Sequence, residues 1–237
     1  MNKHDLIKGI CAGIALSTTQ VALAHTSLVE KTATAGSKYF GTLNVGHGCG
    51  AEDGSHIDTY KLVLDVPDSV STLSNADLRP MEATWGDASI VKDEAGKITQ
   101  LVWTKTADKI RAGADAEDDS WGYRASFTVR TPSAPFTKVV FPAVTQYCKL
   151  ADGSADISTP WTGTAAPTLT LLPAHKAGWN KYDSPVDMTD ADIKAFFADA
   201  LIVWVGEAAY SANPITDSAI TNKLTTISTG DVIWVKY

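Results

Sequence analysis

The stretch Thr59-Tyr60-Lys61-Leu62-Val63-Leu64-Asp65-Val66-Pro67 decides the fold class of this chain. An apolar or aromatic side chain stands at every second position of the stretch, at Tyr60, Leu62, Leu64 and Val66. This two-residue period is that of a β-strand with one buried face, whereas a helix repeats every 3.6 residues. The stretch therefore predicts a half-buried strand.

The same alternation recurs on both sides of this stretch. It is found in Tyr123–Val129, which ends before Pro132, and the turn Glu94–Lys97 predicts a hairpin leading into the next strand. Further strands are predicted at Lys38–Val45, Ile98–Thr104, Val139–Val144 and Thr168–Leu172. Many short strands with little helical periodicity predict an all-β fold, a β-sandwich.

The segment 173–237 has a different pattern. Thr189 is a good N-cap, followed by acidic residues in the first turn, and an apolar helical stripe is formed by Ile193, Phe196, Phe197 and Ala200. Leu201–Val205 and Val232–Val235 are predicted strands, with the turn Ser211–Pro214 between them. We expect a small C-terminal α+β extension docked on the sandwich, with structural support as its role.

Residues 1–24 have the features of a signal peptide. Lys3 and Lys8 supply positive charge, Ile7–Leu23 is mostly apolar or small, and Ala22-Leu23-Ala24 fits the small-x-small cleavage rule. The mature chain should therefore begin at His25. The apolar run is too short to span a bilayer comfortably, so we expect an exported protein with no transmembrane segment after cleavage.

Charge and cysteine content narrow the class of protein. A formal net charge of −7 makes the chain a poor ligand for nucleic acids and anionic membranes. Cys49 and Cys148 remain after cleavage, and an even pair in an exported protein is most simply a disulfide. The alternative is a thiolate metal site, but no Cys-x-x-Cys or Cys-x-His pattern follows either cysteine.

A histidine at the mature N-terminus can chelate a metal ion by itself. The free α-amine and Nδ1 of His25 would close one ring on the ion, and nitrogen ligands in tetragonal geometry suit Cu(II). The amine must lose its proton to bind, so affinity should rise with pH. The competing reading is that histidine occupies the first mature position by chance.

Several motifs in fixed order carry a family resemblance. They are Ala24-His25-Thr26-Ser27-Leu28, Thr34–Tyr39, His47-Gly48-Cys49, Phe141-Pro142-Ala143-Val144-Thr145-Gln146-Tyr147-Cys148, Asp152-Gly153 and Trp161. In this order they resemble the YcnI-like copper-binding domain family, formerly a domain of unknown function, over about residues 25–172. The resemblance implies a cupredoxin-like or fibronectin-like sandwich of the bacterial periplasm or cell envelope, with other copper-handling proteins as partners.

The resemblance also implies a mono-histidine brace for Cu(II) at His25, with Trp161 beside the metal. A rim aromatic is the competing reading of Trp161. Glu30 is a candidate ligand, although it stands one position later than the acid of relatives, which on a strand moves a side chain to the other face. His47 could supply a third nitrogen or could simply stabilise the turn before Cys49.

Other residues with metal-binding chemistry are weaker candidates. His56 and His175 stand in polar, turn-like contexts, and Met81 and Met188 are single methionines of the kind that usually pack in a core. The acidic run from Asp115 to Asp119 lacks the spacing of a calcium-binding loop. We interpret it as a solvated loop.

Three functions remain open at this stage. The first is a non-enzymatic copper-binding protein that buffers, traffics or delivers Cu(II) in the envelope. The second is a copper-dependent oxidative enzyme with His47 as a second histidine ligand. One observation speaks against this enzyme: the tryptophans form no visible sugar-binding pattern. The third is an envelope sandwich without metal. Motifs of hydrolases and phosphate-binding loops are absent from the sequence.

Overall fold

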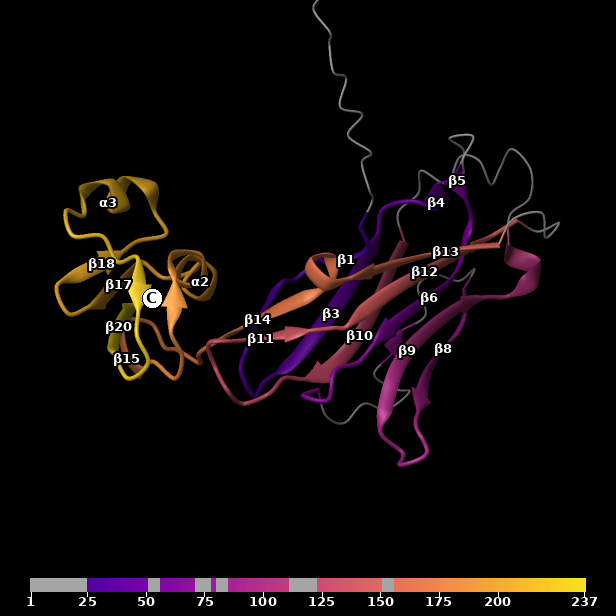
Figure 1. The fold of residues 1–237 in the computed structure, drawn as a ribbon, viewed down its shortest axis with the longest axis horizontal. Coiled ribbons are helices and arrows are strands. Elements are labelled where there is room, and N and C mark those ends of the chain that lie inside the picture. The colour runs from indigo at the N-terminus through magenta and orange to yellow at the C-terminus, as the bar shows by residue number, and fades with distance from the viewer. Residues whose placement is uncertain (1–24, 51–55, 71–77, 80–84, 111–122, 151–155) are drawn as a thin grey trace, which may run out of the picture.

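A computed structural model of the protein describes residues 25–50, 56–70, 78–79, 85–110, 123–150 and 156–237. Figure 1 shows two lobes, a large one built from sheets and a small one, coloured yellow, at the C-terminal end. The large lobe is an all-β sandwich, as the sequence predicts. The small lobe combines a sheet with short helices and is the predicted α+β extension.

One layer of the sandwich is a four-stranded sheet with the order β1-β3-β10-β7. Its strands are β1 (Ser27–Leu28), β3 (Lys38–Val45), β10 (Tyr123–Arg130) and β7 (Leu78–Arg79). A three-stranded sheet has the order β11-β14-β2, and β2 pairs with β14 in parallel. Its strands are β11 (Thr137–Val140), β14 (Thr168–Leu172) and β2 (Thr32–Thr34).

The other layer is a five-stranded antiparallel sheet with the order β13-β12-β6-β9-β8. Its strands are β13 (Asp156–Thr162), β12 (Ala143–Lys149), β6 (Thr59–Asp65), β9 (Ile98–Lys105) and β8 (Trp85–Lys92). The predicted hairpin joins β8 to β9, and the amide of Asp93 donates to the carbonyl of Lys97 across its turn. A short hairpin pairs β4 (Cys49–Gly50) with β5 (His56–Ile57), and two 3₁₀ turns cover Ala107–Lys109 and Gly163–Ala165.

The core lies between these layers, because every second residue of the long strands points inward. Phe127 of β10 is at its centre and has edge-on or tilted contacts with the rings of Tyr39, Trp103 and Phe141 at centroid distances of 5.8–6.4 Å. Such ring contacts add to the free energy gained by burying apolar area. The buried face of β10 is the one that the alternating sequence predicts. In β6 the prediction holds for Leu62 and Leu64, but Val63 is buried as well and Tyr60 is only partly buried.

The predicted single strand Val139–Val144 is wrong, because the chain changes sheets within it. Val139 and Val140 belong to β11, which pairs with β14, whereas Val144 belongs to β12, which pairs with β6. Pro142 cannot donate a backbone hydrogen bond, and the amide of Phe141 donates to Pro167 outside both ladders. The break therefore falls at Phe141-Pro142.

The small lobe contains a four-stranded sheet with the order β15-β20-β17-β18. Its strands are β15 (Trp179–Asp183), β20 (Val232–Lys236), β17 (Ile202–Val205) and β18 (Ala208–Tyr210). A short pair of strands, β16 (Met188–Thr189) and β19 (Thr226–Ile227), accompanies helix α2 (Asp190–Phe196). The predicted cap is confirmed: Thr189 and Asp192 form a reciprocal capping box.

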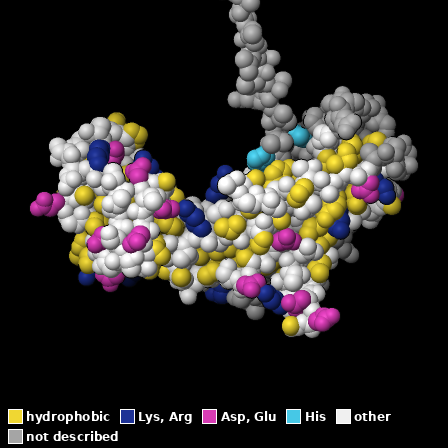
Figure 2. Space-filling view, in the orientation of Figure 1, with side chains coloured by type: hydrophobic (Ala, Val, Ile, Leu, Met, Phe, Trp, Pro, Cys, Tyr) yellow, Lys and Arg dark blue, Asp and Glu magenta, His cyan; other side chains and the backbone are white. Residues whose placement is uncertain are grey.

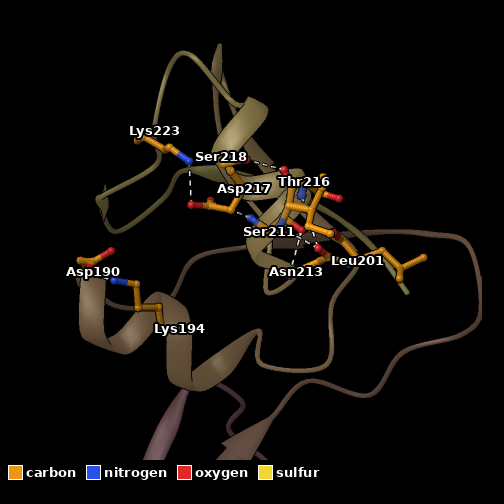
Figure 3. A network of polar contacts seen from close by, with 10 residues as sticks. Asp190, Lys194, Leu201, Ser211, Asn213, Thr216, Asp217, Ser218 and Lys223 are labelled. Carbon is orange, nitrogen blue, oxygen red and sulfur yellow. Dashed lines mark hydrogen bonds and ion pairs between the residues drawn. The ribbon is translucent and has the colours of Figure 1, made fainter.

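A polar network fixes the second helix of this lobe, α3 (Pro214–Ala219), which the sequence analysis treats as part of a turn (Figure 3). Asn213 caps the helix by accepting from the amides of Ile215 and Thr216. The hydroxyl of Ser211 donates to the carbonyl of Leu201 at 2.7 Å, which ties the helix to β17. Lys223 forms an ion pair with Asp217 and also donates to its carbonyl.

The two lobes meet at Phe136, in the loop between β10 and β11. Its ring packs among Tyr182, Phe196 and Phe197 of the small lobe, at centroid distances of 5.5–5.7 Å. Its φ of 59° lies in the left-handed region that a bulky residue rarely adopts. A side chain of the large lobe therefore completes the core of the small one.

Candidate metal centre

His25 is an exposed residue at the start of the described chain. The next residue, Thr26, is fully buried, and the edge strand β1 follows directly. Among the described residues, the buried hydroxyl of Thr26 has no hydrogen-bond partner. The backbone is thus anchored one residue after His25, while the His25 side chain remains accessible to solvent.

The pairing of β1 with β3 brings His25 toward the turn that contains His47. Ser27 pairs with Asn44 and Leu28 with Leu43, so β1 runs antiparallel to the end of β3 that leads into Gly46. His47 is the next residue along the chain. Figure 2 shows histidine side chains, in cyan, on the upper surface of the large lobe.

The turn at His47 is held from the opposite layer of the sandwich. The Nε2 group of Gln146, on β12, donates to the carbonyl oxygen of His47 at 2.7 Å and to the hydroxyl of Thr59 at 2.6 Å. His47 Nδ1 lies 2.5 Å from the carbonyl oxygen of Gly48, which fits a proton on Nδ1. This contact favours the structural reading of His47 over the reading in which Nδ1 binds a metal ion.

The predicted disulfide between Cys49 and Cys148 is confirmed, and it joins the same turn to β12. The Cα atoms are 5.8 Å apart, and both side chains are buried with Ile57 in a small satellite core. The bond closes a loop with a sequence separation of 99 residues. Disulfides persist in oxidising compartments, so the bond is typical of secreted or cell-surface proteins.

Trp161 lies on β13, the edge strand of the five-stranded sheet, and only 7% of its surface is exposed. Its register partner is Val144, and Gln146 stands two residues further along β12 on the same buried face. Such diagonal neighbours have Cα atoms about 7–8 Å apart. The indole of Trp161 is part of the sandwich core, two residues along the ladder from the residue that binds the His47 carbonyl.

Glu30 is not brought to His25 by the local chain. The chain bends at Val29, after the end of β1, and Glu30 follows as an exposed residue. The Tyr39 hydroxyl donates to the Glu30 carbonyl, and burial together with the nearby Glu30 carboxylate raises the pKa of Tyr39. The structure therefore places this carboxylate near Tyr39.

The weaker candidates lie elsewhere. His175 stacks on Tyr237 in the small lobe, and Met188 is buried in the core of that lobe. Met81, the acidic run from Asp115 to Asp119, residues 1–24 and the side chain of His56 lie outside what the structure describes. Among the side chains that it does describe, no three His, Cys, Asp or Glu come together closely enough to hold a metal ion.

The sequence analysis missed a buried charged group beside this region. Lys105 of β9 forms an ion pair with Asp58, with Nζ at 2.7 and 2.9 Å from the two carboxylate oxygens. The Tyr123 hydroxyl joins both, and Nζ lies 5.2 Å from the ring centroid of Trp85. A buried ion pair of this kind adds little net stability, but removal of one partner would leave an uncompensated charge in the core.

A second surface was also missed. Trp179, Trp204 and Trp234 line one open groove on the small lobe. The spacing of these tryptophans along the sequence shows no regular period, because they come from three different strands.

In the part of the chain that is described, no helix has the length and apolar character of a membrane span.

Comparisons with known proteins give little similarity. No model of a known family matches the chain, and no curated protein matches it. Among solved structures, a type II cohesin domain from the cellulosome of Acetivibrio cellulolyticus is 13% identical, with a TM-score of 0.35; the match covers 62% of this chain and 93% of that one. The group B streptococcus pilus 2b backbone protein is 11% identical, with a TM-score of 0.27, covering 90% and 79%. TM-scores this low carry no property over to this chain.

Proposed function

We propose that the chain is an exported copper-binding protein of the bacterial periplasm or cell envelope, related to the YcnI-like family. Its mature N-terminus at His25 would hold Cu(II) through the α-amine and the imidazole. The observation that carries the proposal is the position of His25, which is exposed directly before a fully buried residue. An accessible ligand on an anchored backbone loses little entropy when it binds.

The neighbourhood supports this proposal in two further ways. The start of the mature chain leads into β1, which pairs with the end of β3 that precedes Gly46 and His47. The His47 turn is held by the Cys49–Cys148 disulfide and by Gln146, so the surface facing His25 is fixed. Trp161 would act as the aromatic neighbour of the copper, as the family resemblance implies.

The role that fits such a site is buffering, trafficking or delivery of copper. Copper is then cargo, and one exposed residue that supplies two nitrogen ligands can receive and release it readily. We propose no enzymatic step. Oxygen uptake in the presence of copper and a reductant would instead favour the oxidative-enzyme alternative.

The decisive experiment is a Cu(II) titration against a competing chelator, with electron paramagnetic resonance of the complex. The mature protein beginning at His25 is compared with a form carrying one extra glycine before His25. We expect one tightly bound Cu(II) in the mature form and at least about tenfold weaker binding in the extended form, because the extension converts the amine into an amide. Affinity should rise with pH as the amine, with a reference pKa of about 7.7–8.0, loses its proton.

Two substitutions complete the test. His25→Ala should lose tight binding, whereas His175→Ala, in the small lobe, should leave the titration unchanged. Equal binding by the mature and extended forms would show that the amine is not a ligand. That result, or no binding by either form, would overturn the proposal.

A further inference from the structure

The outer face of the small-lobe sheet carries three exposed tryptophans. Trp204 of β17 and Trp234 of β20 are direct register partners, and Trp179 of β15 pairs with Lys236, two residues from Trp234 on the same face. Their exposed fractions are 55% for Trp179, 41% for Trp204 and 46% for Trp234. Three neighbouring strands therefore present one indole each to solvent.

The core of the small lobe lies on the other face of this sheet. On the opposite face of the same strands, Val203, Ile233 and Val235 are fully buried in the core that includes α2. A half-buried antiparallel strand normally alternates apolar residues inside with polar residues outside. Exposed apolar patches are uncommon on monomeric proteins and mark binding sites.

The rings form a groove rather than a bulge. They line a cavity of about 530 Å³ together with Gly206, in the turn between β17 and β18. A Cβ added at Gly206 would meet nothing within 4 Å, so the end of the groove at this turn is open. An open groove with aromatic walls suits a chain-like ligand whose rings have apolar faces.

The length of the groove points to an oligomer. Neighbouring strands are about 4.8 Å apart, and two residues along a strand add about 6.8 Å, so the outer pair, Trp179 and Trp204, are separated by about 12 Å. That span fits several linked sugar rings better than a single one. The C–H faces of pyranose rings stack on indoles, while their hydroxyl groups stay hydrated.

The charges on this face select among glycans. Lys181 is the register partner of Trp234, and Lys236 is the register partner of Trp179. Within the described residues, neither ammonium group takes part in an ion pair, although the chain has a net charge of −7. Two acidic groups lie at the margin: Asp183, opposite Val232, and Glu207, next to Gly206.

We propose that this tryptophan groove binds an acidic polysaccharide, with the indoles stacking on pyranose rings and Lys181 and Lys236 pairing with carboxylate groups. The small lobe would then hold the protein at a carbohydrate surface. The proposal does not depend on copper binding by the large lobe.

The test is calorimetric titration of the full-length mature protein with two hexasaccharides. An oligo-uronate of alginate carries carboxylates, and cellohexaose is a neutral glycan of the same length. We expect the oligo-uronate to bind about tenfold more tightly at low salt, and this preference should shrink as salt is raised, because added ions screen exposed charges. Trp234→Ala should weaken binding of the oligo-uronate by about tenfold or more, as should Trp179→Ala.

Two controls separate stacking from charge. The double variant Lys181→Gln, Lys236→Gln should bind both hexasaccharides alike, because only the charge preference is lost. Ile215→Ala removes an exposed apolar side chain of α3 outside the groove and should change nothing. Circular dichroism shows that each variant is folded.

Several results would overturn the proposal. They are no binding of either hexasaccharide, equal binding of both by the unsubstituted protein, and unchanged binding by folded Trp234→Ala and Trp179→Ala. Binding to phosphatidylglycerol vesicles in place of the glycans would identify the groove as a membrane contact. Tryptophan-dependent dimers in sedimentation, without glycan binding, would identify it as a self-association surface.

Discussion

At the scale of single residues, Gly41 shows how tightly the sandwich is packed. It lies on β3 opposite Phe127, the central ring of the core. A Cβ at this position would come within 2.5 Å of Phe127 Cζ and 2.7 Å of Tyr39 Cε1. Since Phe127 is itself surrounded by aromatic rings, neither ring can move without disturbing others.

Gly41→Ala should therefore lower the free energy of unfolding by about 1–3 kcal/mol, the usual cost of overpacking a core. Denaturant unfolding followed by circular dichroism measures the change. Gly50→Ala is the matched control, because its Cβ would meet nothing within 4 Å. Equal stability of Gly41→Ala and the unsubstituted protein would mean that the core at Phe127 is looser than described.

At the scale of elements, helix α2 depends on the carboxylate of Asp192. Asp192 accepts from the amide and hydroxyl of Thr189 in the capping box, and its Oδ1 lies 2.7 Å from Nζ of Lys138 on β11. The ion pair with Lys138, followed by the contacts with Thr189, lowers the pKa of Asp192 to about 2. One side chain thus caps a helix of the small lobe and contacts a strand of the large one.

The lowered pKa gives a pH dependence with a definite sign. The Asp192 carboxylate takes up a proton near pH 4 in the unfolded chain but only near pH 2 in the folded protein. The ionised carboxylate therefore stabilises the folded protein, and this contribution is fully present above pH 4. This contribution should be lost as pH falls from about 4 to about 2. Asp192→Asn should remove it, at a cost of about 1 kcal/mol at pH 7.

The measurement is thermal unfolding of both proteins at pH 7, 4 and 2. The difference between them should be largest at pH 7 and should vanish near pH 2. Lys194, which pairs with Asp190 on the solvent side of α2, provides the control, since Lys194→Gln should change little. A difference that stays constant with pH would mean that the Asp192 charge does not contribute.

At the scale of the whole molecule, the association of the lobes depends on Phe136. Its backbone amide donates to Leu171 of β14, which fixes the loop to the sandwich, while its ring is buried against α2 and β15. The unfavourable φ of 59° is tolerated because these contacts determine the conformation.

Phe136→Ala should destabilise the small lobe by about 3–5 kcal/mol, the usual cost of removing a buried phenylalanine ring. Hydrogen exchange of the α2 and β20 amides measures the effect on that lobe, and the sandwich amides report on the other. Phe40→Ala, which removes an exposed ring on β3, should leave the exchange rates of the amides in both lobes unchanged. Uniform loss of protection in both lobes would indicate that they unfold as one unit.

The local pattern of the sequence by itself determined much of the secondary structure. The alternating residues of Tyr123–Val129 and Thr59–Asp65 can bury one face only as strands, and β10 and β6 formed there. Thr189 and the apolar stripe after it likewise determined α2, because capping and helical periodicity act within a few residues. The parity of the cysteines was enough to pair Cys49 with Cys148.

Tertiary structure alone decided how those elements are combined and which side chains are exposed. It assigned the two halves of Val139–Val144 to different sheets, buried Trp161, and placed Trp179, Trp204 and Trp234 together in solvent. It also brought Lys105 to Asp58, which are 47 residues apart. Periodicity depends on neighbouring residues, whereas register and burial depend on strands that are distant in the sequence. A single sequence therefore predicts strands and caps, but not the face on which a given tryptophan is placed.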